Sequence, residues 1–382
     1  MNSFSGDLDP GYAAVGEAFA RNFRERGEIG AACCVYVDGR PVVDIWGGIA
    51  DTRDGRPWTR DTIALTFSAT KGATAICMHR LVESGRLDLD TPIAAVWPEF
   101  AANGKERITP RMVLSHRAGL AAIDGELTFE EVLAGDPVVA ASAAQEPQWT
   151  PGSAHGYHMR SFGWILGEIL RRITGRSLSS YFAEQVAAPL GLEYWIGLPT
   201  EYLPRCARLT FPPPATILPQ VTPLTVRVLT GPSRLFGYND MWNRAELLQA
   251  QMPSSTGVGT ARALARMYAA TIGSVDGVRL LSGETVRAAT TVHSRGPDLS
   301  IPIETCFALG FARPPMLVAG CGPASFGHPG AGGATGFADP EHALTFAYVT
   351  NDLRFDAAGD PRVSTLVEAA YACHAAAPRN PG

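Results

Sequence analysis

FSATK, residues 67–71, opens a run to Glu83 in which apolar residues recur at helical spacing. Ser68 and Lys71 are three positions apart, so a helix places both side chains on one face. This is the arrangement of a serine nucleophile beside an amine. In the first turn of a helix the Ser68 N–H has no partner within the helix and lies at the positive end of the helix dipole, which favours a developing oxyanion.

The choice of lysine at position 71 strengthens this interpretation. The chain holds two lysines, Lys71 and Lys105, against 30 arginines. A serine three residues before a lysine occurs by chance with a probability of roughly 0.1 at this composition. An arginine cannot lose its proton, whereas a partly desolvated lysine can, so Lys71 is a candidate base.

Length and composition limit the classes of function. At 382 residues and 46% hydrophobic content, the chain can bury a sizeable core as two domains or as one domain with a large insertion. The net charge of -5 and the scattered arginines predict no nucleic-acid partner. The first thirty residues lack a basic start followed by an apolar run, and no apolar stretch is long enough to span a membrane. We therefore expect a cytoplasmic protein without a membrane partner, whose seven cysteines are reduced structural thiols.

Strands and helices are expected at both ends of the chain, with a helical region between them. The expected terminal elements are a helix over 12–24, a hairpin over 31–37 and 41–49, a helix over 260–273, strand-like ends over 326–339, a strand over 343–350 and a helix over 362–374. A further helix follows Tyr157, where apolar residues recur from Phe162 to Ile173. This order predicts an α/β (α+β) domain, 1–85 and 255–382, interrupted by a helical domain, 86–198.

The segment 199–254 is rich in proline and in apolar residues. We expect it to lack regular structure and to act as a lid or pocket wall, because long apolar loops in compact domains are commonly functional. Phe211 and Leu218 are its candidate substrate-binding residues, facing the acyl part of a substrate.

A nucleophilic serine needs a base and an oxyanion hole. None of the twenty serines lies in a G-x-S-x-G sequence, which disfavours an α/β-hydrolase site. An amine-assisted serine needs a second proton-transfer group besides Lys71. The phenol of Tyr157 is a plausible base if the ammonium charge lowers its pKa from about 10.

Several motifs carry a resemblance to a known family. SATK at 68–71, YHMRSFGW at 157–164 and FGHPGAGG at 326–333 resemble the three motifs of the class C β-lactamase-like serine hydrolases. WPEFAANG at 97–104, LSHRAGL at 114–120 and GYH at 156–158 are more specifically similar to the family VIII carboxylesterases of that fold. The resemblance extends over nearly the whole chain and implies an antiparallel sheet flanked by helices, as in the β-lactamase/transpeptidase-like fold.

The resemblance also implies roles for individual residues. Ser68 would be the nucleophile, Lys71 and Tyr157 the proton-transfer pair, and the backbone N–H groups of Ser68 and Ala331 the oxyanion hole. No metal and no cofactor is implied.

Two substrate-facing positions differ from those of the β-lactamases. His328 stands where they carry the lysine of Lys-Thr-Gly, and Met159 stands where they carry the asparagine of Tyr-x-Asn. His328 would be cationic only when protonated, near pH 6.5 if its pKa is unperturbed. Gly330 would allow close approach of the backbone. These differences predict a preference for esters over β-lactams.

A metal site is disfavoured, because His155 and His158 form an H-x-x-H pair without a nearby third ligand. The favoured hypothesis is a serine carboxylesterase that hydrolyses short-chain esters, small-molecule substrates, through an acyl-enzyme. The same site could serve an acyltransferase, or a β-lactamase or D-amino-acid peptidase, and a catalytically silent scaffold is the non-enzymatic rival. The sequence leaves the oligomeric state open.

Overall fold

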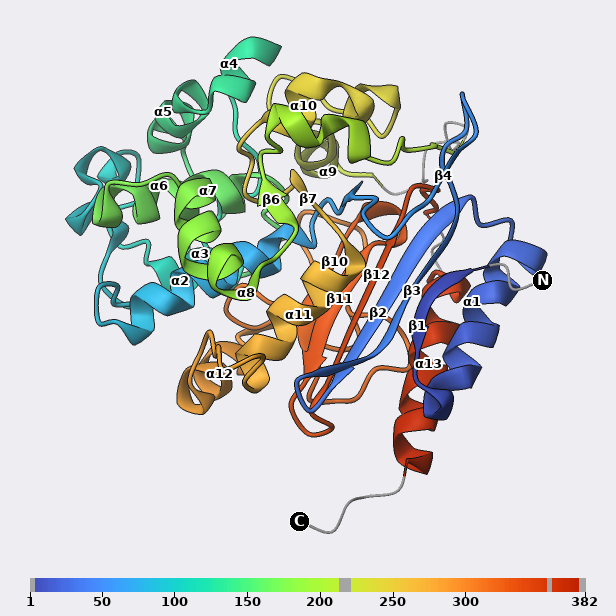
Figure 1. Ribbon diagram of the computed structural model, residues 1–382. Coiled ribbons are helices and arrows are strands. Elements are labelled where there is room, and N and C mark those ends of the chain that lie inside the picture. Colours follow the sequence, from blue (N-terminus) through green and yellow to red (C-terminus); the bar gives the residue numbers. More distant parts are fainter. Residues whose placement is uncertain (1–3, 213–220, 356–358, 378–382) are drawn as a thin grey trace.

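An antiparallel sheet forms the centre of the computed structural model, which describes residues 4–212, 221–355 and 359–377 (Figure 1). Its strand order is β1-β3-β2-β12-β11-β10, and β4 pairs antiparallel with β3 off this path. The strands are β1 (Ser5–Leu8), β2 (Gly30–Val37), β3 (Arg40–Asp51), β4 (Arg56–Pro57), β10 (Phe326–Pro329), β11 (Thr335–Asp339) and β12 (Leu344–Thr350). Of the helices in these ranges, none is both long and apolar enough to cross a membrane.

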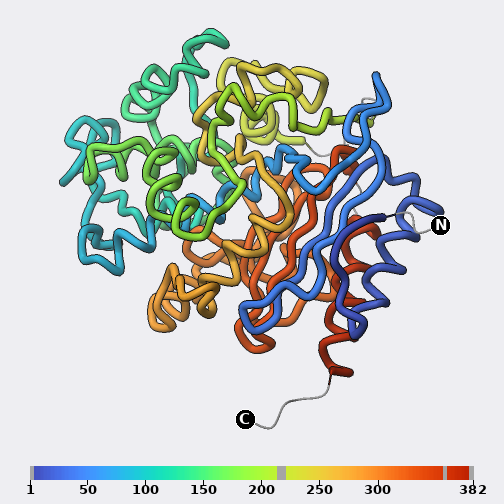
Figure 2. Tube along the Cα trace, viewed as in Figure 1, coloured from blue at the N-terminus to red at the C-terminus, as the bar shows by residue number. Residues whose placement is uncertain are grey.

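The beginning and the end of the chain meet in this sheet. β2 pairs antiparallel with β12, with Ala31 opposite Thr350, and Figure 2 shows the blue strands beside the red ones. The predicted hairpin is present as β2 and β3, which pair antiparallel. Asp38 and Gly39 make its turn with φ of 48° and 74°, and two successive left-handed residues match the twist of a two-residue hairpin.

Helices cover both faces of the sheet. α1 (Ala13–Glu25) and α13 (Pro361–Ala376) pack against each other beside one face of the sheet (Figure 1), and they share an apolar cluster with that face. α11 (Ala261–Ile272) crosses the other face, against β2, β11 and β12. All three helices lie where the sequence predicts them, within one to two residues at their ends.

The helical region lies to one side of α11 and the sheet (Figure 1). Its helices and those that connect it to the sheet are α2 (Thr70–Glu83), α3 (Pro110–Leu114), α4 (Phe129–Ala134), α5 (Asp136–Ala144), α6 (Ser161–Thr174), α7 (Leu178–Phe182), α8 (Ala188–Leu190), α9 (Pro223–Thr230), α10 (Ala245–Gln249) and α12 (Gly283–Thr290). α2 contacts α6, α7, α12 and β10, so it is buried on nearly every side. This central helix carries the candidate lysine at its second position.

Two small sheets complete the architecture. β5 (Ala64–Leu65) pairs with β7 (Gly257–Gly259), which also pairs with β6 (Tyr194–Ile196). β5 leads directly into α2, so its pairing with β7 brings the backbone around residue 254 to the start of α2. β8 (Ser294–Pro297) and β9 (Glu304–Phe307) form a separate hairpin.

The prediction that 199–254 lacks regular structure is wrong for its described part. Thr222 caps α9 by accepting from the Thr225 N–H, and Pro223 occupies the first helical position, where a missing N–H costs nothing. α10 and two 3-10 turns, Thr200–Arg205 and Asp240–Asn243, are further short elements, and the Asn239 side chain caps the second turn by accepting from the Met241 N–H. A proline-rich composition therefore does not exclude helices, since Pro223 starts one.

Candidate active site

Ser68 lies on a tight turn between β5 and α2. The preceding Phe67 has a φ of 46°, a left-handed conformation that costs a non-glycine residue on the order of 1 kcal/mol. Its ring packs edge-on against Trp242 and Tyr238, with centroids 5.1 and 5.9 Å away, which holds the turn in place. The turn leaves Ser68 half-buried, two residues before the first residue of α2.

Lys71 is fully buried, and its amine contacts three oxygen atoms. Nζ lies 3.3 Å from Ser68 Oγ, 2.6 Å from the Met159 carbonyl oxygen and 3.2 Å from the Ser254 carbonyl oxygen. Within the described ranges no carboxylate forms an ion pair with it. The three-residue spacing therefore places Ser68 and Lys71 together, as predicted.

Tyr157 completes the cluster from the loop that precedes α6. Its hydroxyl donates to Ser68 Oγ at 2.8 Å, and its ring stacks on Phe307 at 5.8 Å with an interplanar angle of 6°. Its backbone N–H donates to both carboxylate oxygens of Asp298 at 3.0 Å. The same carboxylate accepts from the N–H groups of Ser300 and Ile301, so Asp298 ties the Tyr157 backbone to the loop before β9.

Burial shifts the pKa values of both proton-transfer candidates toward their neutral forms. Burial, and then the positive charge of Arg160, hold the pKa of Lys71 well below its usual value. Burial raises the pKa of Tyr157, although the hydrogen bond to Ser68 opposes this shift. The condition under which Tyr157 would be a plausible base, a pKa lowered by an ammonium charge, is therefore not met.

The hydrogen bonds of the cluster are all satisfied when both groups are neutral. A neutral lysine amine has two N–H donors and one lone pair, and it faces two carbonyl oxygens, of Met159 and Ser254, and one hydroxyl. The carbonyls take both N–H groups, which leaves the lone pair for the O–H of Ser68. Ser68 Oγ in turn accepts from the Tyr157 hydroxyl. An ammonium with a phenolate would fit the same contacts, but burial disfavours both charges.

Arg160 is a second buried cation in this region, and sequence reasoning missed it. Its Nη1 donates to the carbonyl oxygens of Val228 and Leu229 at 2.9 and 3.0 Å, and its guanidinium lies 4.4 Å from the ring centroid of Phe236. Burial lowers the pKa of Arg160. Arg160 is three residues after Tyr157, but nothing in the sequence distinguishes it from the other arginines of the chain. Asp298 is far from Tyr157 in the sequence and belongs to no motif that would indicate a role.

His328 lies at the end of β10 and faces Tyr157, at a ring distance of 5.9 Å. It is 1% exposed, and its Nδ1 lies 2.7 Å from the Pro329 carbonyl oxygen. Nε2 is buried without a hydrogen-bond partner among the described residues. Burial, and then the charge of Lys71, lower the pKa of His328 to about 3. The expectation that it becomes cationic near pH 6.5 is therefore wrong.

Gly330 and Ala331 bring the loop after β10 to the serine turn. A Cβ on Gly330 would lie 2.1 Å from the Thr66 carbonyl oxygen, so only glycine allows this approach. Ala331 begins a 3-10 turn, Ala331–Gly333, directly after it. The paired N–H groups of Ser68 and Ala331 as an oxyanion hole stay a prediction.

The other predicted substrate-facing residues have different surroundings. The Met159 side chain is 9% exposed and packs in an apolar cluster with Tyr157 and Phe307, while its carbonyl binds Lys71. Phe211 packs against the apolar cluster that contains Phe67. Leu218 lies outside the described residues.

A cavity of about 550 Å³ borders the loop after β10. That loop, the segment 316–319 and the start of α13 line it. Met316, Leu317 and Phe355 give it apolar walls, and Ala331 lies on its border. Ser68, Lys71 and Tyr157 are not among the residues that line it.

The H-x-x-H pair holds ordinary hydrogen bonds. His158 Nδ1 lies 2.6 Å from the Gly156 carbonyl oxygen, and its Nε2 accepts from the Leu120 N–H. His155 Nε2 lies 3.1 Å from Thr305 Oγ1. Over the part of the chain that the structure describes, no three His, Cys, Asp or Glu side chains gather where they could hold a metal ion.

Comparisons with known proteins show the family and the fold of the chain. The sequence matches the family described as Beta-lactamase over residues 19–369. It is 37% identical over 367 residues to the esterase/beta-lactamase LipL of Mycobacterium tuberculosis, covering 91% of this chain and 83% of LipL. The structure resembles a family VIII carboxylesterase, with a TM-score of 0.90, 34% identity and coverage of 97% and 99% of the two chains. It also resembles a penicillin-binding protein homolog from Caulobacter crescentus, with a TM-score of 0.89, 38% identity and the same coverage.

Proposed function

Because this chain belongs to the Beta-lactamase family and is similar to proteins named as esterases, we propose that it is a serine carboxylesterase that hydrolyses short-chain esters through an acyl-enzyme on Ser68. One observation carries the assignment of Ser68. It is the hydrogen-bonded chain from the Tyr157 hydroxyl through Ser68 Oγ to the Lys71 amine. A serine in this chain is poised to lose its proton to a neutral amine in a buried site.

Acylation begins with Lys71 as the base. The proton of the Ser68 hydroxyl passes to the Lys71 lone pair while Oγ bonds to the ester carbonyl carbon. The carbonyl oxygen takes the π electrons and becomes an oxyanion, which the N–H groups of Ser68 and Ala331 would stabilise. The C–O bond then breaks, the leaving alkoxide takes the Tyr157 hydroxyl proton, and the phenolate takes the proton from Lys71. The alcohol is released, and both groups are neutral again.

Deacylation reverses these roles with water as the nucleophile. Water gives a proton to Lys71 as its oxygen bonds to the acyl carbon, and Ser68 leaves and regains its proton. The products are the carboxylic acid and the free enzyme. An alcohol or amine in place of water would give acyl transfer, so the same acyl-enzyme serves both reactions.

Substitution of the nucleophile tests the proposal. Ser68→Ala should abolish hydrolysis of p-nitrophenyl butyrate and labelling by a fluorescent phosphonate, with an unchanged circular dichroism spectrum. Ser84→Ala, an exposed serine after the last residue of α2, is the matched control and should keep both. Wild-type turnover by Ser68→Ala would refute the mechanism. A folded wild-type protein that takes no label would favour the non-enzymatic scaffold.

Hydrolysis of β-lactams is the second candidate, because the name of the Mycobacterium tuberculosis relative includes that activity. His328 is neutral at working pH and offers no charge to a β-lactam carboxylate. Loss of a charged partner costs on the order of 1.5 to 3 kcal/mol of binding. We expect kcat/KM for p-nitrophenyl butyrate to exceed that for nitrocefin by at least about two orders of magnitude. Comparable values would move the assignment to a β-lactamase or D-amino-acid peptidase.

A reducing compartment suits this protein. All seven cysteines lie in the described ranges, and none forms a disulfide. Free thiols are typical of cytosolic proteins, which supports the cytoplasmic location that we expect from the sequence. Alkylation in denaturant, followed by mass spectrometry without reduction, should find all seven thiols alkylated.

A further inference from the structure

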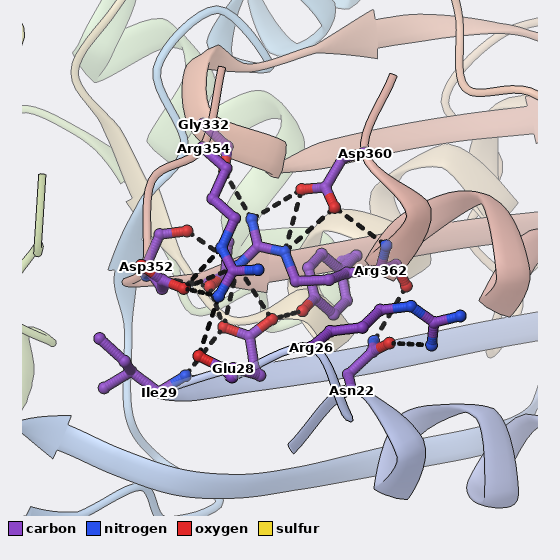
Figure 3. Close-up of polar contacts among 12 residues, drawn as sticks. Asn22, Arg26, Glu28, Ile29, Gly332, Asp352, Arg354, Asp360 and Arg362 are labelled. Carbon is purple, nitrogen blue, oxygen red and sulfur yellow. Dashed lines mark hydrogen bonds and ion pairs between the residues drawn. The ribbon is translucent and has the colours of Figure 1, made fainter. Parts of the chain in front are cut away.

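A buried ionic cluster lies beside the loop that follows β10 (Figure 3). Its centre is Arg362, the second residue of α13, whose side chain is fully buried. The guanidinium forms ion pairs with Glu28 at 3.1 Å, Asp352 at 3.3 Å and Asp360 at 2.6 Å. Arg354 adds a second cation through its ion pair with Asp352 at 2.6 Å.

Stability alone is a weak reason for such a cluster. Removing charges from water costs about as much as their mutual attraction returns, and apolar replacements of buried ion pairs are often neutral or stabilising. The hydroxyls of Tyr348 and Thr350 donate to Glu28, so its carboxylate is well solvated by the protein. Burial nevertheless raises the pKa of Glu28, against the effect of Arg362. We therefore ask which part of the backbone the cluster holds in place.

The cluster holds the backbone of the loop between β10 and β11. The Gly332 carbonyl oxygen accepts from Arg362 Nη2 at 3.2 Å and from the Arg354 backbone N–H at 3.3 Å, as Figure 3 shows for these side chains. Gly333 has a φ of 117°, and a Cβ there would lie 2.8 Å from Asp360 Oδ2 and 3.2 Å from Arg362 Nη2. The loop is thus fitted directly to the ionic side chains.

The other end of the loop is held by the serine turn. Gly330 fits against the Thr66 carbonyl oxygen, and its N–H donates to the Ala334 carbonyl oxygen at 2.6 Å. Ala331 therefore lies between two anchored glycines, one tied to the serine turn and one tied to Arg362. The Ala331 N–H lies in the peptide plane between Gly330 and Ala331, two peptides before the plane that carries the Gly332 carbonyl, so the two anchors limit the backbone dihedral angles that set its direction.

We propose that Arg362 is a positioning residue that aims the Ala331 N–H at the reacting carbonyl oxygen by fixing the Gly332 carbonyl. The proposal rests on the roles of Ser68 and Ala331 given under the proposed function. An oxyanion donor is effective only when its direction is preorganised, and removal of one donor costs roughly 10²- to 10³-fold in kcat. Displacement of the donor should cost part of that factor.

Arg362→Lys tests the proposal with the charge retained. A single ammonium cannot reach three carboxylates and the Gly332 carbonyl at once, because it lacks the planar fork of arginine. We expect kcat for p-nitrophenyl butyrate to fall by roughly 10- to 100-fold with KM within about twofold, because the interaction is made in the transition state. Tyr348→Phe is the matched control, since it disturbs the same cluster at Glu28 without touching Gly332, and it should keep kcat within about twofold.

A thionoester substrate separates positioning from general destabilisation. Sulfur is a weaker acceptor than oxygen, so an enzyme with an aligned oxyanion hole prefers the oxygen ester, and misalignment reduces that preference. The ratio of kcat/KM for the oxygen ester to that for the thionoester should fall at least about fivefold in Arg362→Lys and stay unchanged in Tyr348→Phe. If Arg362→Lys fails to fold, Asp360→Asn keeps the α13 cap and should show a smaller shift in the same direction.

The outcomes distinguish this inference from the proposed function. A wild-type enzyme whose Ser68 takes the phosphonate, together with an Arg362→Lys enzyme of unchanged kcat and unchanged ester-to-thionoester ratio, would overturn the inference alone. Equal losses in Arg362→Lys and Tyr348→Phe would overturn it as well, because they would mean that only stability changed. Absence of phosphonate labelling in the wild type would instead refute the proposed function on which it rests.

Discussion

Replacement of Lys71 by arginine should nearly abolish ester hydrolysis while leaving the protein folded. Arginine keeps the positive charge that lysine can carry, but its guanidinium has five donors and no lone pair, and it does not lose its proton. The carbonyl oxygens of Met159 and Ser254 would still find donors. The Ser68 hydroxyl would lose the one acceptor that can take its proton.

The size of the effect follows from the proton transfer that is lost. General base catalysis contributes typically 10²- to 10⁴-fold, and we expect kcat/KM for p-nitrophenyl butyrate to fall by at least about 100-fold in Lys71→Arg. Because 1.36 kcal/mol corresponds to tenfold, this is a loss of about 3 kcal/mol or more of transition-state stabilisation. Initial rates over a range of substrate concentration give kcat and KM separately.

The second lysine of the chain supplies a matched control. Lys105 is also fully buried, and its amine also donates to two backbone carbonyls, of Ala102 and Gln145, while it contacts the ring of Phe100. Lys105→Arg should lower the melting temperature by an amount similar to Lys71→Arg and keep kcat/KM within about twofold. A Lys71→Arg enzyme within tenfold of the wild type would refute the reasoning, because it would mean that a permanent cation suffices.

Three further predictions concern stability, orientation and the pocket. Burial lowers the pKa values of His79, His158 and His328 to about 4, 4 and 3. Below pH 6.5 these histidines therefore bind protons in the unfolded chain but not in the folded protein, which lowers the free energy of unfolding. Each histidine should lower it by on the order of 2 kcal/mol between pH 7 and pH 5, as measured by urea unfolding. A flat stability between pH 7 and 5 would contradict this. Asp298→Asn weakens the hydrogen bonds that the Tyr157 backbone N–H donates to residue 298, and it should lower kcat about tenfold with little change in KM. Unchanged kinetics would mean that Asp298 does not position Tyr157. Phe211→Ala should shift the preferred acyl-chain length more than the melting temperature if 199–254 walls the pocket, and a change in stability alone would assign Phe211 to the core.

The fold could be predicted from the sequence where local patterns and motifs carry the information. The hairpin at 31–49 and the helices α1, α11 and α13 follow from periodicity. The β-lactamase-like fold, expected from the resemblance, is confirmed by the family match and by the similar solved structures. The prediction of irregular structure for the proline-rich segment is wrong because proline content alone does not show where a proline lies relative to a helix. The structure places Pro223 at the first position of α9, where proline is tolerated.

The candidate site could be predicted only in its sequence-local parts. Ser68 and Lys71 are three residues apart, so a helix brings them together. Tyr157 required the resemblance to a family, because its approach to Ser68 depends on the packing of α6 against α2. The contacts of Lys71 with two carbonyl oxygens were not predictable, because every residue has a carbonyl and only the fold selects two of them.

The protonation states were predicted least well. The pKa of Tyr157 depends on burial, which is the sum of all packing around the ring and has no local sequence signal. Arg362 illustrates the same limit, since its partners Glu28 and Asp352 are brought to it by the pairing of β2 with β12 and by α13. The sequence predicted which groups lie together but not their protonation states or the residues that hold them in place.

The charge state of Lys71 in the resting enzyme is the central claim of the mechanism. The chain has two lysines, so protein labelled with ¹³C at lysine Cε gives two lysine signals, and Lys105→Arg assigns them. We predict that the Lys71 signal has the position of a neutral amine at pH 8 and moves to the ammonium position only on acidification, because burial and Arg160 lower its pKa well below the usual value. A Lys71 signal that stays at the ammonium position from pH 6 to pH 9 in active enzyme would contradict the account.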